Sequence, residues 1–167
     1  RDSSTSRGLG DVYKRQVMNF DKTNYIYEIK DVKQYYRKTR DERIKVKSPE
    51  NVADFCKKLI GNSVREKFLL VGLNTKNEVT FVYTVFIGTI NMSPIHPREV
   101  FQVAILNSCA SIILAHCHPS DDPTPSNEDR DATKRFEECG ELLGIPVLDH
   151  IIVTENGYFS FRENNLF

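Results

Sequence analysis

Several features that would assign the chain to a specialised class of protein are missing from the sequence. It carries no net charge at neutral pH, because 23 basic residues balance 23 acidic ones, so no overall field favours nucleic acid or a membrane surface. No apolar stretch approaches the roughly 20 residues that span a bilayer. The first residues also lack the basic-then-apolar pattern of a secretory signal. These absences predict an ordinary cytoplasmic globular protein.

The cysteines lack the spacing of a disulfide framework, and none of them forms a CxxC pair. There are four in all: Cys56, Cys109, Cys117 and Cys139. We interpret them as reduced thiols, as expected in the cytosol.

The first 16 residues differ in character from the rest of the chain. The segment RDSSTSRGLGDVYKRQ is polar and has almost no apolar side chains to bury. Its end, DVYKRQ, resembles the read-through of a sequencing adapter. We therefore expect residues 1–16 to be a non-native leader, residues 17–167 to form one domain, and Met18 to be the natural start. The alternative that a natural segment upstream of Met18 is missing stays open.

Strands and helices alternate along the chain, which predicts an α/β fold with a mixed sheet between layers of helices. Helices are predicted at residues 48–61, 96–109 and 126–144, and strands at 66–73, 79–89, 111–115, 147–153 and 157–161. The strands at 66–73 and 79–89 are apolar on both faces, so we expect both to be central. An edge strand is predicted near residues 25–36, and the basic connection after it runs to Lys47.

The strand at 111–115 leads into the most unusual segment of the chain, LAHCHPSDDPTPSNED. His116 and His118 alternate at the end of this strand, so their side chains start on the same side of the backbone. Ser126 or Asn127 is the expected cap of the next helix, and Asp129 lies one turn inside it on the face that Ser126 starts. If the proline-rich loop turns back, Asp129 can join the two histidines.

Two imidazoles and one carboxylate suit a zinc ion whose fourth position is left for water. Such an ion lowers the pKa of its water from about 15.7 to about 7. Open α/β sheets also place their sites at the carboxyl ends of strands, where this segment lies. The plainer alternative is a pair of histidines that face solvent or form ordinary hydrogen bonds.

The spacing H-x-H, seven residues, S, two residues, D matches the signature of the JAMM (JAB/MPN) metalloproteases at every defined position. HPREVF, the loop AHCHPSDDPTPSNED and LLGIPVLDH…YFSFRE resemble the RadC branch of bacterial proteins, over roughly residues 25–163. RadC proteins usually read HNHPSGDP in the loop, so Cys117 replaces an asparagine and Asp121 a glycine. The resemblance does not extend to the N-terminal helical domain that longer RadC proteins carry, which weakens a DNA-repair interpretation.

The resemblance implies a three-layer α/β/α fold of the cytidine deaminase-like JAB/MPN type and a zinc-dependent peptidase or isopeptidase. By carry-over, His116, His118 and Asp129 bind Zn²⁺. Ser126 would hydrogen-bond the developing oxyanion, with a plain helix cap as the alternative role.

Members of the family also need a glutamate that deprotonates the attacking water, and two residues could supply it. Glu66 opens a strand directly after the first helix, where the family motif places its glutamate. Glu99 lies in the first turn of a helix, where the helix dipole alone explains an acidic residue. We therefore favour Glu66 as the general base.

The remaining histidines and Cys117 have structural explanations. Cys117 should point away from the histidine face and pack in the core, with a role as a fourth metal ligand as the alternative. His96 precedes Pro97 and is expected at the surface or as a cap. His150 lies in an apolar strand, so we expect a hydrogen-bonded core histidine, paired with Asp149.

The leading hypothesis is therefore a zinc hydrolase that cleaves amide or isopeptide bonds of a protein or peptide substrate. A DNA-associated accessory protein is the main alternative, with Lys38–Lys47 as its only candidate basic face. A metal-binding scaffold without catalysis is a third possibility. A nucleoside deaminase is disfavoured because the HxE and PCxxC elements are missing. The natural substrate and the oligomeric state stay open.

Overall fold

The structure is a computed structural model that describes residues 34–38, 44–88 and 95–167. The chain divides into two compact units, residues 1–39 and residues 40–167. In the first unit, the described residues form neither helix nor strand. The second unit contains every helix and strand of the described residues.

Several sequence predictions fall outside the described residues. These are the leader at residues 1–16, the start at Met18, and residues 39–43 of the basic segment. The predicted edge strand near 25–36 is wrong at its described end, because residues 34–36 form no strand. Tyr35 and Tyr36 are exposed there, so they do not bury the alternating apolar side that a sheet strand needs.

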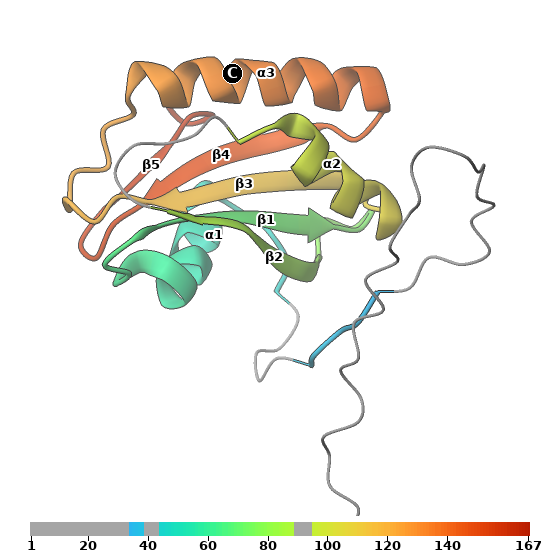
Figure 1. Ribbon diagram of the computed structural model, residues 1–167, viewed down its shortest axis with the longest axis horizontal. Helices are drawn as coiled ribbons and strands as arrows, with labels where there is room; N and C mark the ends of the chain where they lie inside the picture. The colour runs from blue at the N-terminus through green and yellow to red at the C-terminus, as the bar shows by residue number, and fades with distance from the viewer. Residues whose placement is uncertain (1–33, 39–43, 89–94) are drawn as a thin grey trace, which may run out of the picture. The chain divides into compact units, whose positions relative to one another are not determined.

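A five-stranded mixed sheet organises the second unit, with strand order β2-β1-β3-β4-β5 (Figure 1). The strands are β1 (Glu66–Leu73), β2 (Val79–Gly88), β3 (Ser111–Cys117), β4 (Val147–Val153) and β5 (Tyr158–Ser160). Only β3 and β4 pair in parallel, and the other neighbours are antiparallel. The predicted mixed sheet is therefore confirmed.

Helices cover both faces of this sheet. They are α1 (Pro49–Cys56), continued by a π-helical turn η2 (Lys57–Gly61), α2 (Pro97–Leu106) and α3 (Asn127–Leu143). In Figure 1, α1 lies on one side of the sheet, with α2 and α3 on the other. The predicted three-layer α/β/α arrangement is confirmed.

Two cores result from the alternation of side chains along the strands. Leu69 and Val71 of β1 pack with α1 and η2 on one face. Phe68 and Leu70 pack with α2 and α3 on the other face. Because β1 and β3 are buried on both faces, their ends are fixed from two sides, and the functional segment begins at the end of β3.

Local capping explains where the helices begin. The Ser48 hydroxyl accepts a hydrogen bond from Asn51 N at 3.2 Å, and Pro49 occupies the first helical position of α1, as predicted. His96 caps α2, since its Nδ1 accepts from Arg98 N at 3.1 Å. The predicted capping or surface role of His96 is confirmed.

The prediction that β2 is a central strand is wrong. In the sheet of the described residues β2 pairs only with β1 and forms an edge, and Tyr83 and Ile87 on it are 44% and 55% exposed. Its apolar residues on two sides are explained by packing: Val82 contacts the α1 core, and Phe81 contacts the α2–α3 core. Hydropathy reports whether the two faces of a strand are covered, but it carries no information about its neighbours in the sheet.

All four cysteines are free thiols, as predicted. Cys56 is fully buried in the α1 core, and this burial raises the pKa of its thiol to about 12. Among the described residues, no helix combines the length and the hydropathy needed to cross a membrane.

Candidate metal centre

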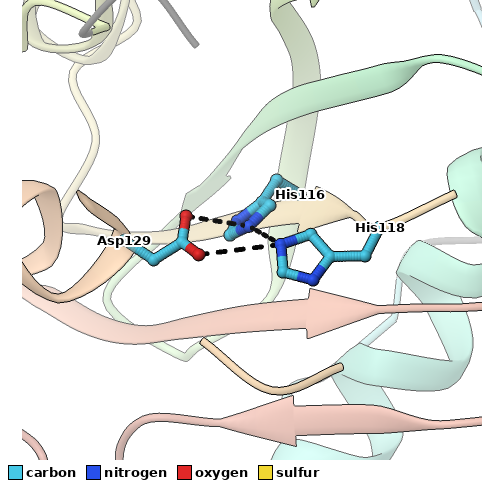
Figure 2. Close-up of side chains that lie close together, drawn as sticks. All are labelled: His116, His118 and Asp129. Carbon is cyan, nitrogen blue, oxygen red and sulfur yellow. Dashed lines mark hydrogen bonds and ion pairs between the residues drawn. The ribbon is translucent and has the colours of Figure 1, made fainter. Parts of the chain in front are cut away.

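Three side chains predicted as metal ligands converge where β3 ends and α3 begins. His116 is the second-last residue of β3, His118 follows that strand, and Asp129 lies in the first turn of α3. His116 Nε2 is 3.0 Å from His118 Nε2 and 3.2 Å from Asp129 Oδ1, and His118 Nε2 is 3.6 Å from Asp129 Oδ2 (Figure 2). One potential ligand atom from each residue lies within 4.8 Å of the others. Both His116 and Asp129 are 2% exposed.

The start of α3 fixes the direction of the Asp129 carboxylate. Ser126 Oγ accepts from Asp129 N at 3.1 Å, and Asp129 Oδ2 accepts from Ser126 N at 2.8 Å. These reciprocal bonds form a capping box. Ser126 Oγ also donates to Asp129 Oδ2 at 2.6 Å. Ser126 is thus the helix cap that the sequence predicts, and its hydroxyl also contacts the cluster.

The loop between β3 and α3 orients the ring of His118. His118 Nδ1 is 2.8 Å from the carbonyl oxygen of Asp122. Because a carbonyl only accepts, Nδ1 carries the hydrogen, and in the neutral ring the Nε2 lone pair faces His116 and Asp129. The loop is held in turn by Asp121, which adopts φ 61° and binds Asn156 through both carboxylate oxygens. Asp121 therefore takes the left-handed conformation that glycine would reach at no steric cost.

The electrostatics of the cluster favour a bound cation. Burial acts to raise the pKa of Asp129, but the facing imidazoles of His116 and His118 and the Ser126 hydroxyl outweigh it and hold that pKa well below its usual range. The hydrogen bond with Asp129 raises the pKa of His118 above its ordinary value. The carboxylate is therefore ionised and buried, and it needs a proton or a metal ion beside it.

Glu66 lies at the same end of the sheet. Phe68 of β1 pairs with His116 of β3, so the alternation of side chains brings Glu66 to the same face, at the level of His118. The negative charge of Glu66 contributes to the raised pKa of His118. Its Oε2 atom is buried and has no hydrogen-bond partner among the described residues. Such an oxygen is costly unless a water or another donor binds it.

Glu99 is not brought to this cluster. It lies in the first turn of α2, its side chain is 58% exposed, and it forms an ion pair with Arg98 at 3.6 Å. Of the two glutamates that the sequence offers, Glu66 is the one beside the histidines.

The donor set fits a divalent metal ion that accepts imidazole nitrogen and carboxylate oxygen. Three protein ligands leave a further coordination position for water or substrate. The unsatisfied Oε2 of Glu66 beside the cluster is the second observation that fits such an ion, because it offers an acceptor to a water held there.

Comparison with known proteins agrees with this geometry. Residues 46–166 match the family described as the RadC-like JAB domain. The chain belongs to this family. The matched residues include β3 and α3, where the cluster lies, and β1, which begins with Glu66.

Bacterial relatives of known sequence share this domain. The UPF0758 protein of Bacillus pumilus is 44% identical over 128 residues, which cover 77% of this chain and 57% of the relative. The UPF0758 protein of Geobacillus kaustophilus is 47% identical over 122 residues, or 73% of this chain and 54% of the relative. The chain therefore spans about half the length of the curated relatives that it matches.

A third histidine of this chain lies beside the cluster, and the sequence prediction gave its partners incorrectly. His150 of β4 is buried, as predicted. Its ring contacts His116 Nδ1 through Nε2 at 2.9 Å and Thr133 Oγ1 through Nδ1 at 2.6 Å. Asp149 instead accepts from the backbone N–H of His150 and from Ser160 Oγ. Burial lowers the pKa of His150 well below its ordinary value.

One signal for this contact is present in the sequence, and another is not. Thr133 follows Asp129 by four residues, so the two share a helix face. The parallel pairing that sets β4 beside β3, with Leu114 opposite His150, is a long-range contact that no local pattern encodes.

Cys117 has the packing role that was predicted. It is 1% exposed and lies in the α1 core, on the face of the sheet away from His116. Its Sγ contacts the Arg65 carbonyl at 3.5 Å, so it is not a member of the metal cluster of the RadC-like JAB domain.

Proposed function

We propose that this domain is a zinc-dependent hydrolase of amide or isopeptide bonds in protein or peptide substrates. The observation that supports it most is the convergence of His116, His118 and Asp129 within 4.8 Å at the carboxyl end of β3. Membership of the RadC-like JAB domain family supports the coarser statement, a metal-dependent hydrolase. Zinc is the proposed ion because it favours this mixture of nitrogen and oxygen ligands.

A zinc ion held by these three side chains would supply Lewis-acid polarisation and a more acidic water. The chain's own residues have the task of holding the donors apart in a fixed geometry. His116 is fixed by the strand, Asp129 by the capping box, and His118 by the Asp122 carbonyl. Ligands preset in this way do not have to be ordered when the ion binds.

Glu66 is the proposed general base. Its Oε2 is buried and unsatisfied, so it can accept a proton from the attacking water and pass it to the leaving amine. Proton transfer of this kind contributes about 10²–10⁴-fold to the rate of an enzyme.

Ser126 is the proposed donor to the developing oxyanion. Its hydroxyl donates to Asp129 Oδ2 at 2.6 Å in this structure. Rotation about the Cβ–Oγ bond would redirect the hydrogen toward substrate and leave the oxygen in place. Accepting from Asp129 N uses a lone pair rather than the hydrogen, so the cap and the oxyanion contact are compatible.

The test compares Glu66→Gln with the matched control Glu99→Gln in zinc-loaded protein, using a peptide library and an isopeptide-linked library. Glu66→Gln should lower turnover by about 10²-fold or more, with zinc content unchanged. Glu99→Gln removes an equal charge from an exposed position and should leave turnover near wild type.

Two results would contradict the proposal. The first is zinc-loaded wild-type protein that cleaves neither library. The second is a Glu66→Gln variant that cleaves as fast as the wild-type protein, which would exclude Glu66 as the base.

A further inference from the structure

A chain of hydrogen bonds behind the cluster links His116 to the backbone of α3. His116 Nδ1 contacts His150 Nε2 at 2.9 Å, and His150 Nδ1 contacts Thr133 Oγ1 at 2.6 Å. Thr133 Oγ1 in turn lies 2.6 Å from the carbonyl oxygen of Asp129. This series of hydrogen bonds therefore begins at one proposed ligand and ends at the backbone of another.

The direction of this chain is set at its α3 end. A threonine hydroxyl has a single hydrogen, and a backbone carbonyl can only accept. Thr133 therefore donates to Asp129 O, because two acceptor oxygens at 2.6 Å would repel each other. Its oxygen then accepts from His150, so the hydrogen of that ring lies on Nδ1.

The position of the hydrogen on His150 also determines which nitrogen of His116 carries a hydrogen. The His150 ring hydrogen-bonds to Thr133 and His116, neither of which carries a carboxylate, and Asp149 is engaged by Ser160 Oγ and by backbone N–H groups. A positive charge on this buried ring would lack a carboxylate in contact, which is costly. The Nε2 of His150 is therefore an acceptor, and His116 donates to it from Nδ1.

We propose that Thr133 and His150 are positioning residues that fix His116 as the Nδ1–H tautomer and keep its Nε2 free for a metal ion. This inference rests on the proposed metal centre and deepens it. If His150 Nε2 donated to His116 Nδ1 instead, the neutral His116 ring would carry its hydrogen on Nε2, at the position where the ion has to bind.

The tautomers explain why the cluster suits a cation. His118 is oriented in the same sense by the Asp122 carbonyl, so the Nε2 atoms of His116 and His118 and the Asp129 carboxylate are three acceptors that face one another. Acceptors at these distances are stable together only when a positive charge lies among them.

Aromatic packing keeps the two rings in place. Phe68 stacks on His116 with ring centroids 6.0 Å apart and planes at 10°. Phe161 stacks on His150 at 5.1 Å and 10°. Both phenylalanines are buried, so water is excluded from the hydrogen bonds between the rings, and rotation of either ring is hindered.

Thr133→Val tests the proposal, because valine has the shape of threonine but cannot accept from His150. Without that acceptor, His150 can carry its hydrogen on Nε2, and His116 then carries its own on Nε2. The affinity for zinc alone, measured by competition with a chromophoric chelator, should fall about 10–100-fold. Thr133→Ser keeps the hydroxyl and should restore affinity to within about threefold of wild type.

Thr80→Val is the matched control. Thr80 Oγ1 also donates to a backbone carbonyl, that of Gly72, at 3.1 Å. Gly72 lies near the end of β1 that is opposite to Glu66. Thr80→Val should leave zinc affinity unchanged. A Thr133→Val variant that binds zinc as tightly as Thr80→Val overturns the proposal.

The tautomers can also be measured directly, in zinc-free wild-type protein, by ¹H–¹⁵N correlation spectra of the histidine rings. The pH should be about two units above the ordinary histidine pKa, where a histidine in water is neutral. A hydrogen on Nδ1 of both His116 and His150 supports the proposal. A His116 ring without a hydrogen on Nδ1, or a hydrogen on Nε2 of His150, overturns it, even where Thr133→Val does not fold. Because this readout needs neither zinc nor turnover, failure of the proposed hydrolase and failure of the tautomer assignment are distinguishable.

Discussion

At the scale of single residues, His118 is the proposed ligand most exposed to competition from protons. Its side chain is 15% exposed, and the hydrogen bond with Asp129 raises its pKa above the ordinary 6.5. A proton and a metal ion compete for the same Nε2 lone pair, because metals bind the neutral imidazole.

Zinc affinity should therefore fall as the pH decreases through the raised pKa of His118, with the loss beginning above pH 6.5. The stability of the metal-free fold depends on pH in the opposite direction. A raised pKa means that protonated His118 stabilises it fully below pH 6.5, and this contribution is lost as the pH rises through the folded-state pKa. Chelator competition measures the first effect, and denaturant unfolding of wild type and His118→Gln measures the second. Zinc affinity that does not change between pH 6 and pH 8 would contradict this account of His118.

At the scale of elements, the first turn of α3 combines structural and chemical tasks. Ser126 caps the helix and contacts Asp129 Oδ2 with its hydroxyl. A single replacement by alanine would remove both contributions, so it could not separate them.

Ser126→Gly separates these roles, since glycine at a helix cap costs only a few tenths of a kcal/mol and has no side-chain donor. Ser126→Ala should lower the free energy of unfolding by about 1 kcal/mol, and Ser126→Gly by much less. Both variants should lose turnover to a similar extent if the hydroxyl stabilises the oxyanion. A glycine variant with wild-type turnover would show that Ser126 is only a cap.

Elements whose signals are local were predicted well from the sequence. Ser48 with Pro49, and Ser126 with Asp129, mark the starts of helices within a few residues, and alternation placed His116 and His118 on one side of the backbone. These features depend on neighbours along the chain.

Features set by long-range pairing were predicted poorly. The edge position of β2 depends on which strand lies beside β1, and the His116–His150 contact joins residues 34 apart in sequence. The partner of His150 was therefore assigned to Asp149, its neighbour in sequence. Glu66 is favoured over Glu99 by the family motif and because the helix dipole explains Glu99. The position of Glu66 opposite His118 depends on the β1–β3 register, which no local pattern predicts.

At the scale of the whole molecule, the cluster links the sheet to the helical layer on one face. His116 comes from β3 and Asp129 from α3, and few of these contacts would persist in an unfolded chain. An ion that binds them stabilises the folded state by linkage.

Zinc should therefore raise the melting temperature of the protein. At about 100 times the dissociation constant, the gain is about 2.7 kcal/mol, which corresponds to roughly 10 °C for a chain of this size. A chelator should reverse the shift, and His118→Gln, which leaves the capping box of α3 intact, should show a much smaller one. Equal shifts in wild type and His118→Gln would indicate that zinc binds elsewhere.

The most direct test of the metal centre is a crystal structure of the zinc-loaded protein with anomalous data at the zinc edge. We expect one strong anomalous peak about 2.0–2.2 Å from His116 Nε2, His118 Nε2 and a carboxylate oxygen of Asp129, with one further coordination position open. Crystals grown with excess zinc that show no anomalous peak among these three side chains would contradict this expectation.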